Sequence, residues 1–246
     1  NKKSNAGEFL SVGNIIGIDN IKLSIDEVIK TGTKALSADD FELVANVTDA
    51  LIIDVRHQFE FIKGFIPQSI FIGLGGTFAP WVGALVKDIH QPILLVVPDE
   101  MQKETIIRLS RVGFDNVLGY LQGGFESWEA SGKEVDTLQS VSAEVLAQQL
   151  DKDALVFDVR KPGEYAAEHI ENVTSTPLDF LNDHLTEFPT NKDFYVHCAG
   201  GYRSVIAASI LKARGFRKVI DVTGGYGAIK ETGIKRTQAI ACSNSK

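Results

Sequence analysis

Residues 193–209, DFYVHCAGGYRSVIAAS, join a strand, a glycine-containing loop and a helix in one short stretch. Phe194, Tyr195 and Val196 form an aromatic and β-branched run that predicts a buried strand. From Val205 onward, Ala, Ile and Leu favour a helix. Cys198 stands where the strand should end, and sites in open α/β sheets lie beyond the carboxyl ends of strands. The stretch therefore predicts an α/β fold with a cysteine at the edge of the sheet.

The loop around Cys198 has the chemistry of an anion-binding site. The first backbone N–H groups of a helix have no partner inside it, and a glycine-rich turn points further N–H groups inward. Such a nest favours the thiolate form of a cysteine that faces it. Arg203 adds a permanent charge and a planar fork of donors. We expect Cys198 to be the nucleophile and Arg203 to orient the substrate. We also expect the rest of the loop to bind the substrate: Ala199, Gly200, Gly201, Tyr202 and Ser204.

The pattern Cys-x-x-Gly-x-Arg, formed by Cys198, Gly201 and Arg203, resembles the active-site loop of rhodanese-type sulfurtransferases. The resemblance implies covalent catalysis in which the cysteine carries one sulfur atom as a persulfide, with no cofactor. Cysteine phosphatases related to this family have one more residue between Cys and Arg, which widens the loop for phosphate. The shorter spacing here indicates sulfur transfer.

The rest of the chain contains an internal repeat, which predicts two copies of one structural unit. Residues 51–56, LIIDVR, correspond to residues 155–160, LVFDVR, and GGF at 123–125 corresponds to GGY at 224–226. Continuous apolar runs of this kind mark strands buried on both faces. We expect two tandem rhodanese-like domains, each a mainly parallel sheet flanked by helices. Their expected limits are a leader or linker at 1–34, a first domain at 35–134 and a catalytic domain at 135–246.

The first unit lacks a cysteine, and its equivalent loop is Val97–Lys103. Pro98 withholds a backbone donor. Asp99 and Glu100 place negative charge where an anion would bind. We therefore expect the first domain to be catalytically inactive and to serve as a structural or interaction domain.

Three residues near the predicted site are interpreted as supports. Asp158 and Arg160 follow a buried strand, and buried charges are costly unless they are paired. We expect them to bind each other or Glu164. His197 precedes the nucleophile by one residue, and neighbouring side chains on a strand point to opposite faces. His197 should therefore point away from the nest.

Composition limits the classes of partner. The chain has 246 residues, 44% of them hydrophobic, and a net charge of −7, which argues against nucleic acid or an anionic membrane as the main partner. No apolar run reaches the length of a membrane span. No His/Cys cluster has metal-ligand spacing, so we expect no metal site. Cys198 and Cys242 give no disulfide framework and fit a reducing compartment, so we expect a cytoplasmic protein.

These features favour a sulfurtransferase that takes sulfur from thiosulfate or a low-molecular-weight persulfide. The acceptor would be a thiol, sulfite or cyanide. One alternative is a cysteine phosphatase or arsenate reductase, for which Cys242 is a poor resolving thiol. Another is a persulfide-binding module without turnover, within a larger sulfide-detoxifying protein. The segment before two such domains also resembles the junction of fusion proteins with an upstream metallo-β-lactamase-fold persulfide dioxygenase, which would make that domain a partner.

Overall fold

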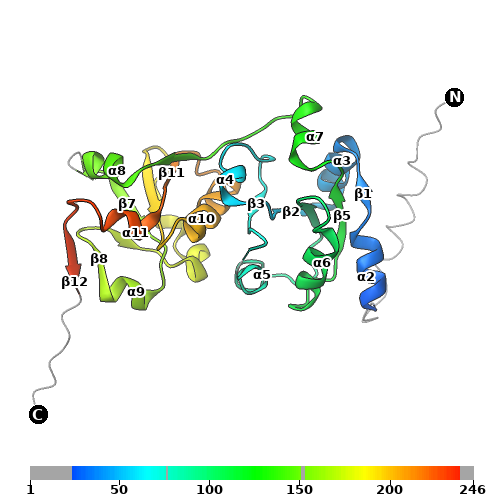
Figure 1. Cartoon of the computed structure of the whole chain (residues 1–246), viewed down its shortest axis with the longest axis horizontal. Coiled ribbons are helices and arrows are strands. Elements are labelled where there is room, and N and C mark those ends of the chain that lie inside the picture. Colours follow the sequence, from blue (N-terminus) through cyan, green and yellow to red (C-terminus); the bar gives the residue numbers. More distant parts are fainter. Residues whose placement is uncertain (1–23, 76, 151–152, 239–246) are drawn as a thin grey trace, which may run out of the picture.

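The computed structural model describes residues 24–75, 77–150 and 153–238. Two α/β domains lie side by side along the long axis of the molecule (Figure 1). The first runs from blue to green in the figure and the second from green to red. Each contains a five-stranded parallel sheet with helices packed around it, which confirms the predicted fold class.

The first sheet has the strand order β1-β5-β4-β2-β3. Its strands are β1 (Ala35–Leu36), β2 (Leu51–Asp54), β3 (Ile70–Phe71), β4 (Ile93–Val96) and β5 (Val117–Leu121). Its helices are α2 (Ile25–Gly32), α3 (Ala38–Thr48), α4 (Gln58–Phe61), α5 (Phe78–Leu85), α6 (Gln102–Ser110) and α7 (Gly124–Ala130). The hydroxyls of Ser24 and Ser37 accept backbone N–H bonds at the starts of α2 and α3, which is the usual role of serine before a helix.

The second sheet repeats this order as β6-β11-β10-β7-β9, so the sequence repeat is a structural repeat. Its strands are β6 (Gln139–Val141), β7 (Leu155–Asp158), β9 (Thr174–Ser175), β10 (Phe194–His197) and β11 (Val219–Val222). Its helices are α8 (Ala143–Leu150), α9 (Pro162–Ala167), α10 (Tyr202–Ala213) and α11 (Gly225–Ile229). A separate antiparallel pair joins β8 (Glu168–Ile170) to β12 (Arg236–Gln238).

Two segments differ in detail from what the sequence suggests. The charged stretch at 179–187 has the composition of a solvated helix, but it forms the short 3₁₀ turns η2 (Leu178–Asp183) and η3 (Leu185–Glu187). Leu178 and Leu181 are buried, so the first of these turns belongs to the core. Helix α2 lies in the stretch described above as a leader, yet its Val28 is buried in the core of the first domain. The last part of the leader is therefore packed structure.

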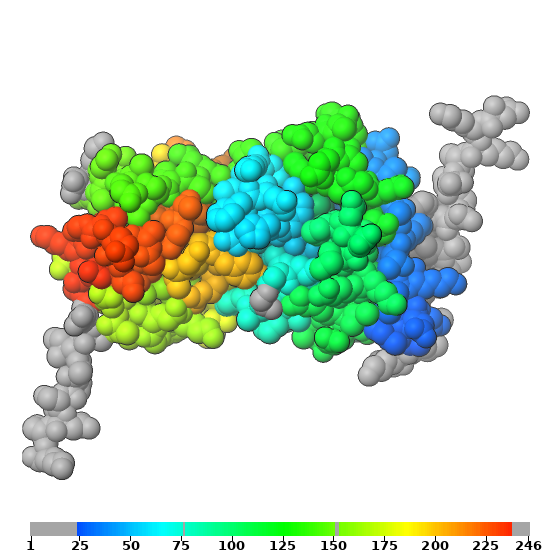
Figure 2. All heavy atoms as spheres, in the orientation of Figure 1, coloured from blue at the N-terminus to red at the C-terminus, as the bar shows by residue number. Residues whose placement is uncertain are grey.

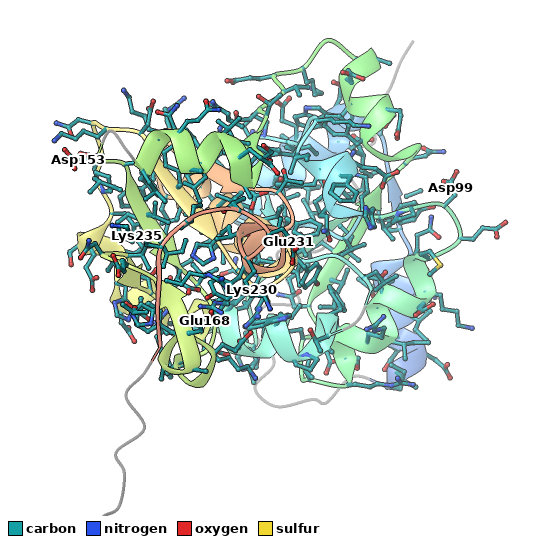
Figure 3. The ribbon with its side chains drawn as sticks, turned by 60° about the vertical axis from the view of Figure 1, so that its left-hand side comes forward. Asp99, Asp153, Glu168, Lys230, Glu231 and Lys235 are labelled. Atoms are coloured by element: carbon teal, nitrogen blue, oxygen red, sulfur yellow. The ribbon has the colours of Figure 1, made fainter. Side chains whose placement is uncertain are left out.

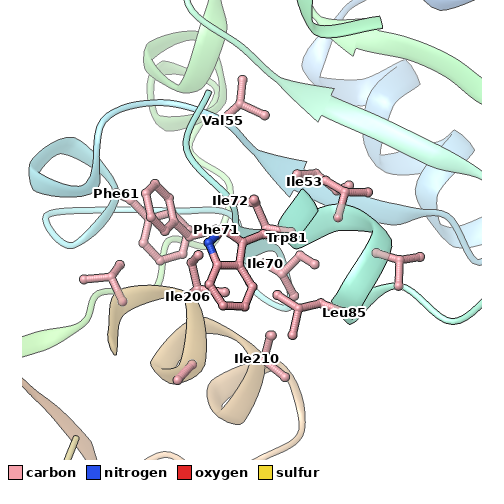
Figure 4. Packing of buried hydrophobic residues seen from close by; sticks show 14 of the residues in the cluster. Ile53, Val55, Phe61, Ile70, Phe71, Ile72, Trp81, Leu85, Ile206 and Ile210 are labelled. Atoms are coloured by element: carbon pink, nitrogen blue, oxygen red, sulfur yellow. The ribbon is translucent and has the colours of Figure 1, made fainter. Parts of the chain in front are cut away.

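One hydrophobic cluster spans both domains, in addition to a cluster within each, and α10 is the element that joins the two domains. Ile206 and Ile210 of α10 lie against Phe71 and Trp81 of the first domain (Figure 4). The backbone N–H of Phe71, on the edge strand β3, donates a hydrogen bond of 2.9 Å to the hydroxyl of Ser209 on α10. In the space-filling view the cyan segment around α4 lies directly against the second domain (Figure 2).

The linker between the domains is held to the same helix. Lys212, near the end of α10, forms an ion pair of 2.9 Å with Asp136 and donates a hydrogen bond of 2.8 Å to the carbonyl of Thr137. Among the described residues, no helix is long and apolar enough to cross a membrane.

Candidate active site

Cys198 follows β10 directly, and its sulfur lies under the start of α10. Gly201 precedes the helix with a φ of 92°, a left-handed conformation that glycine adopts without strain. This conformation lets the N–H of Gly201 donate a hydrogen bond of 3.1 Å to Sγ of Cys198. The cysteine is only 1% exposed. The sulfur is therefore enclosed, with one backbone donor directed at it.

A second turn holds the backbone of the cysteine in place. The N–H of Tyr226 donates to the carbonyl of Cys198 at 2.6 Å, and the N–H of Gly227 donates to the carbonyl of Ala199 at 2.9 Å. A Cβ atom on Gly225 would lie 2.4 Å from the carbonyl oxygen of Cys198. Close backbone approach therefore requires glycine at this position.

Arg203 does not stand free in the loop. Its guanidinium makes two hydrogen bonds to the carboxylate of Glu164 on α9, at 2.6 and 2.8 Å. The bonds from Arg203 lower the pKa of Glu164 to about 2. The same bonds raise the pKa of Arg203. The fork that we expected to face a substrate anion is bound to a carboxylate of the protein itself.

Asp158 and Arg160 bind each other and are almost fully buried. The arginine makes paired bonds to the carboxylate, the shortest 2.6 Å, and donates to the carbonyl of Glu168 at 2.7 Å. Its guanidinium carbon lies 3.8 Å from the centre of the Tyr226 ring. This arrangement braces the carboxyl end of β7 against α11.

The same arrangement occurs in the first domain, which has no cysteine. Arg56 makes paired bonds to Asp54, the shortest 2.6 Å, and donates to the carbonyl of Gly64 at 2.8 Å. Its guanidinium carbon lies 4.2 Å from the centre of the Phe125 ring. A device present in both copies serves the fold, and this duplication favours the supporting role expected for Asp158 and Arg160.

His197 is fully buried on the strand before the nucleophile. Its Nδ1 lies 3.3 Å from the carbonyl oxygen of Cys198, and its Nε2 lies 3.8 Å from a carboxylate oxygen of Asp158. Burial lowers the pKa of His197, which favours the neutral ring. His197 therefore contacts the backbone of Cys198 and not its sulfur, which fits a supporting role.

Tyr202 extends from the loop to the first domain. Its hydroxyl donates a hydrogen bond of 2.9 Å to the carbonyl of Gly73, and its ring packs edge-on against Phe71 at 5.6 Å. Burial raises the pKa of Tyr202 to about 12. The residue also lines a pocket of about 440 Å³ formed mainly by first-domain segments, including Arg56 and Leu74. Tyr202 therefore links the loop to the other domain.

Beneath the loop lies a carboxylic acid that the sequence analysis missed. Asp221 on β11 is buried, and burial raises its pKa to about 6. The hydroxyls of Ser204 and Ser140 favour its charged form. The Ser140 contact is 3.3 Å long, while the buried hydroxyl of Ser204 makes no hydrogen bond of normal length. Of the remaining predicted loop residues, Gly200 has open space around it.

The loop of the first domain that corresponds to the active-site loop is closed on itself. Val97 is buried, and the N–H of Met101 donates to the carbonyl of Pro98 at 3.2 Å. Asp99 projects from the outer side of the first domain, far across the view from Glu168 and Lys230 (Figure 3). Within the described residues there is no cluster of side chains that could hold a metal ion. Cys242 lies outside the described residues.

Known proteins resemble this chain at the level of the single domain and, for one family model, in both halves. A family model for the rhodanese-like domain matches residues 37–131 and again residues 142–232. YrkF of Bacillus subtilis, which is named provisionally as a sulfur carrier protein, is 34% identical over 99 residues, or 39% of this chain and 54% of YrkF. A sulfurtransferase of Allochromatium vinosum is 28% identical over 99 residues, or 39% of this chain and 92% of that protein.

Among solved structures, a rhodanese-like domain protein from Staphylococcus aureus is 31% identical, with a TM-score of 0.37, over 40% of this chain and 97% of that one. A thiosulfate sulfurtransferase from Pseudomonas aeruginosa is 21% identical, with a TM-score of 0.38, over 85% of this chain and 44% of that one. The chain thus spans about half the length of YrkF. It spans nearly the whole length of the Allochromatium and Staphylococcus proteins.

Proposed function

This chain belongs to the family of rhodanese-like domain proteins, and from that premise we propose that it transfers sulfane sulfur through a persulfide on Cys198. The Cys198 thiolate attacks the outer sulfur of a donor, thiosulfate or a persulfide. A new S–S bond forms at Sγ, and the S–S bond of the donor breaks, with its electron pair leaving on sulfite or on a thiolate. An acceptor thiolate, sulfite or cyanide then takes the outer sulfur, and the Cys198 thiolate is restored.

The placement of Cys198 is the observation that carries this proposal. The sulfur lies at the carboxyl end of a parallel strand, below the start of α10, and accepts a bond from the N–H of Gly201. A persulfide carries its negative charge on the outer sulfur, which backbone donors at a helix start stabilise. The six-residue spacing from Cys198 to Arg203 suits one bound sulfur atom.

The first domain is proposed to be catalytically silent. Its loop has no cysteine, and the acidic pair Asp99 and Glu100 would repel a sulfur anion. Its contribution is support, because Gly73 accepts the hydroxyl bond of Tyr202 in the catalytic loop and Phe71 packs against the same ring.

Mass spectrometry of the intact protein tests the nucleophile. After treatment with thiosulfate or with cysteine persulfide, the parent should gain the mass of one sulfur atom, and cyanide should remove it. Cys198→Ser should gain none, because an alcohol cannot carry sulfane sulfur. Cys242→Ser is the matched control and should behave as the parent does. Persulfide formation in Cys198→Ser at the parental level would end the assignment.

A further inference from the structure

The cation of the catalytic loop is neutralised by a fixed carboxylate. Glu164 holds Arg203 with bonds of 2.6 and 2.8 Å and also accepts the N–H of Lys161 at 3.0 Å. The Arg203 side chain is 16% exposed. Both partners are thus anchored, and a donor that approaches Cys198 meets an arginine whose charge is already balanced.

The first domain has an equivalent glutamate, Glu60, which binds no loop arginine. Glu60 occupies the position of Glu164 and caps α4 in the same way, accepting the N–H of His57 at 3.0 Å. No arginine occurs in Val97–Lys103, the segment equivalent to the catalytic loop. Both glutamates therefore cap a helix, and in the second domain Glu164 also neutralises the loop arginine, Arg203.

We propose that the Glu164–Arg203 pair makes this site select donors with one negative charge, such as a persulfide anion, over the thiosulfate dianion. The inference rests on the sulfur-transfer function proposed above. Attack by a thiolate on a dianion brings three negative charges together, which needs an unpaired cation nearby. Attack on a persulfide anion, R–S–S⁻, brings two together and releases R–S⁻ as the persulfide forms on Cys198. A balanced arginine serves the second reaction better than the first.

Two donors of similar shape and different charge test the selection. Thiosulfate carries two charges and releases sulfite, while methanethiosulfonate carries one and releases methanesulfinate. The measurement is the ratio of kcat/KM for thiosulfate to kcat/KM for methanethiosulfonate. Glu164→Gln frees the charge of Arg203, so this ratio should rise by about tenfold, the effect of one unbalanced charge at a partly solvated site. Glu60→Gln makes the same change in the first domain and should leave the ratio unchanged.

A second variant separates charge from shape. Glu164→Asp keeps the negative charge on a shorter side chain, so the ratio should stay within about twofold of the parent. An unchanged or lower ratio in Glu164→Gln, or an equal rise in Glu60→Gln, would overturn the proposed selection.

Alkylation of Cys198 gives a readout that does not need turnover. The rate with anionic iodoacetate, divided by the rate with neutral iodoacetamide, should rise in Glu164→Gln and not in Glu60→Gln. Sulfur transfer with no rise in either ratio overturns the donor selection alone. Absence of transfer from every donor in the parent, with normal alkylation, overturns the proposed function and the selection with it.

Discussion

At the scale of single residues, Asp221 is a buried group whose charge changes with the pH of the solution. Its pKa is raised to about 6 by burial, against an ordinary value of 3.8. The folded state therefore binds a proton that the unfolded state has released between these two values. The stability that protonated Asp221 contributes is full below pH 3.8 and is lost as the pH rises through about 6.

Asp221→Asn should remove this dependence on pH. Between pH 4 and pH 7 the parent should lose on the order of 1–3 kcal/mol of stability that the variant keeps, so the free energy of unfolding of the variant should rise by that amount relative to the parent. Urea unfolding at several pH values measures the difference. Asp99→Asn, at an exposed position of the first domain, is the control and should follow the parent at each pH. A difference for Asp221→Asn that stays constant with pH would contradict the raised pKa.

Gly225 is the residue on which the geometry around Cys198 depends most closely. Its φ is 54°, and an added Cβ would lie 2.4 Å from the Cys198 carbonyl oxygen. Gly225→Ala should cost on the order of 2–4 kcal/mol of stability and slow persulfide formation, because the backbone of Cys198 must move. Gly163→Ala, at a helical site with open space, should neither lower stability nor slow persulfide formation. Thermal unfolding and the mass assay check both. Normal persulfide formation in Gly225→Ala would show that the turn does not position the cysteine.

At the scale of elements, the sequence predicts the central strands of each sheet but not the edge strands. The central strands β2, β4, β7 and β10 are built mainly from continuous apolar runs, the pattern that predicts buried strands. The edge strands β3 and β9 have two residues each, which is too short for any pattern to indicate. Their place is set by tertiary pairing with β2 and β7.

The site likewise has one part that the sequence predicts and one part that only the structure shows. A local motif identifies Cys198 and its loop, because nucleophile, glycines and arginine lie within six residues. The partner of Arg203 lies 39 residues away on another helix, and a charged residue at a helix start gives no sign of what it binds. The repeat gives one indication. Glu60 and Glu164 occupy matching positions in the two units, and this match could have predicted that both glutamates cap a helix.

The loop of the first domain offers a test at this scale. Val97→Cys in a Cys198→Ser background should form no persulfide with thiosulfate, because Asp99 and Glu100 remain beside the new thiol and Pro98 still withholds a donor. Replacing Val97–Gln102 by the sequence of Cys198–Arg203 supplies the donors and the cation together and should form more. Mass spectrometry gives the answer for both. Turnover near the parental rate in the single substitution would refute the view of this domain as a scaffold.

At the scale of the whole molecule, α10 unites catalysis with domain association. It begins at the catalytic loop, packs Ile206 and Ile210 into the shared core, and ends beside the linker through Lys212. The two domains should therefore unfold together. The chain provides a separate reporter for each domain, because both tryptophans, Trp81 and Trp128, lie in the first domain and Cys198 lies in the second.

Unfolding in urea, followed by tryptophan fluorescence and by the exposure of the Cys198 thiol, should give one midpoint. Ser209→Ala leaves the buried N–H of Phe71 without its partner, so both midpoints should fall together, with a loss of about 1–3 kcal/mol. Ser131→Ala removes a hydroxyl bond within the first domain and is the matched control. Midpoints that separate in the parent would show that the domains are independent.

The bond between Phe71 and Ser209 also has a consequence for the order of synthesis. Its two residues are 138 positions apart, so the edge of β3 leaves the ribosome long before α10 does. At ribosomal rates of roughly 5–20 residues per second, this interval lasts about 7 to 28 s. During that time the nascent first domain has an uncovered strand edge and an apolar face, the features that promote association with other chains. We therefore expect the nascent first domain to be the form of this protein most prone to associate with other chains, for a time set by translation of the second domain.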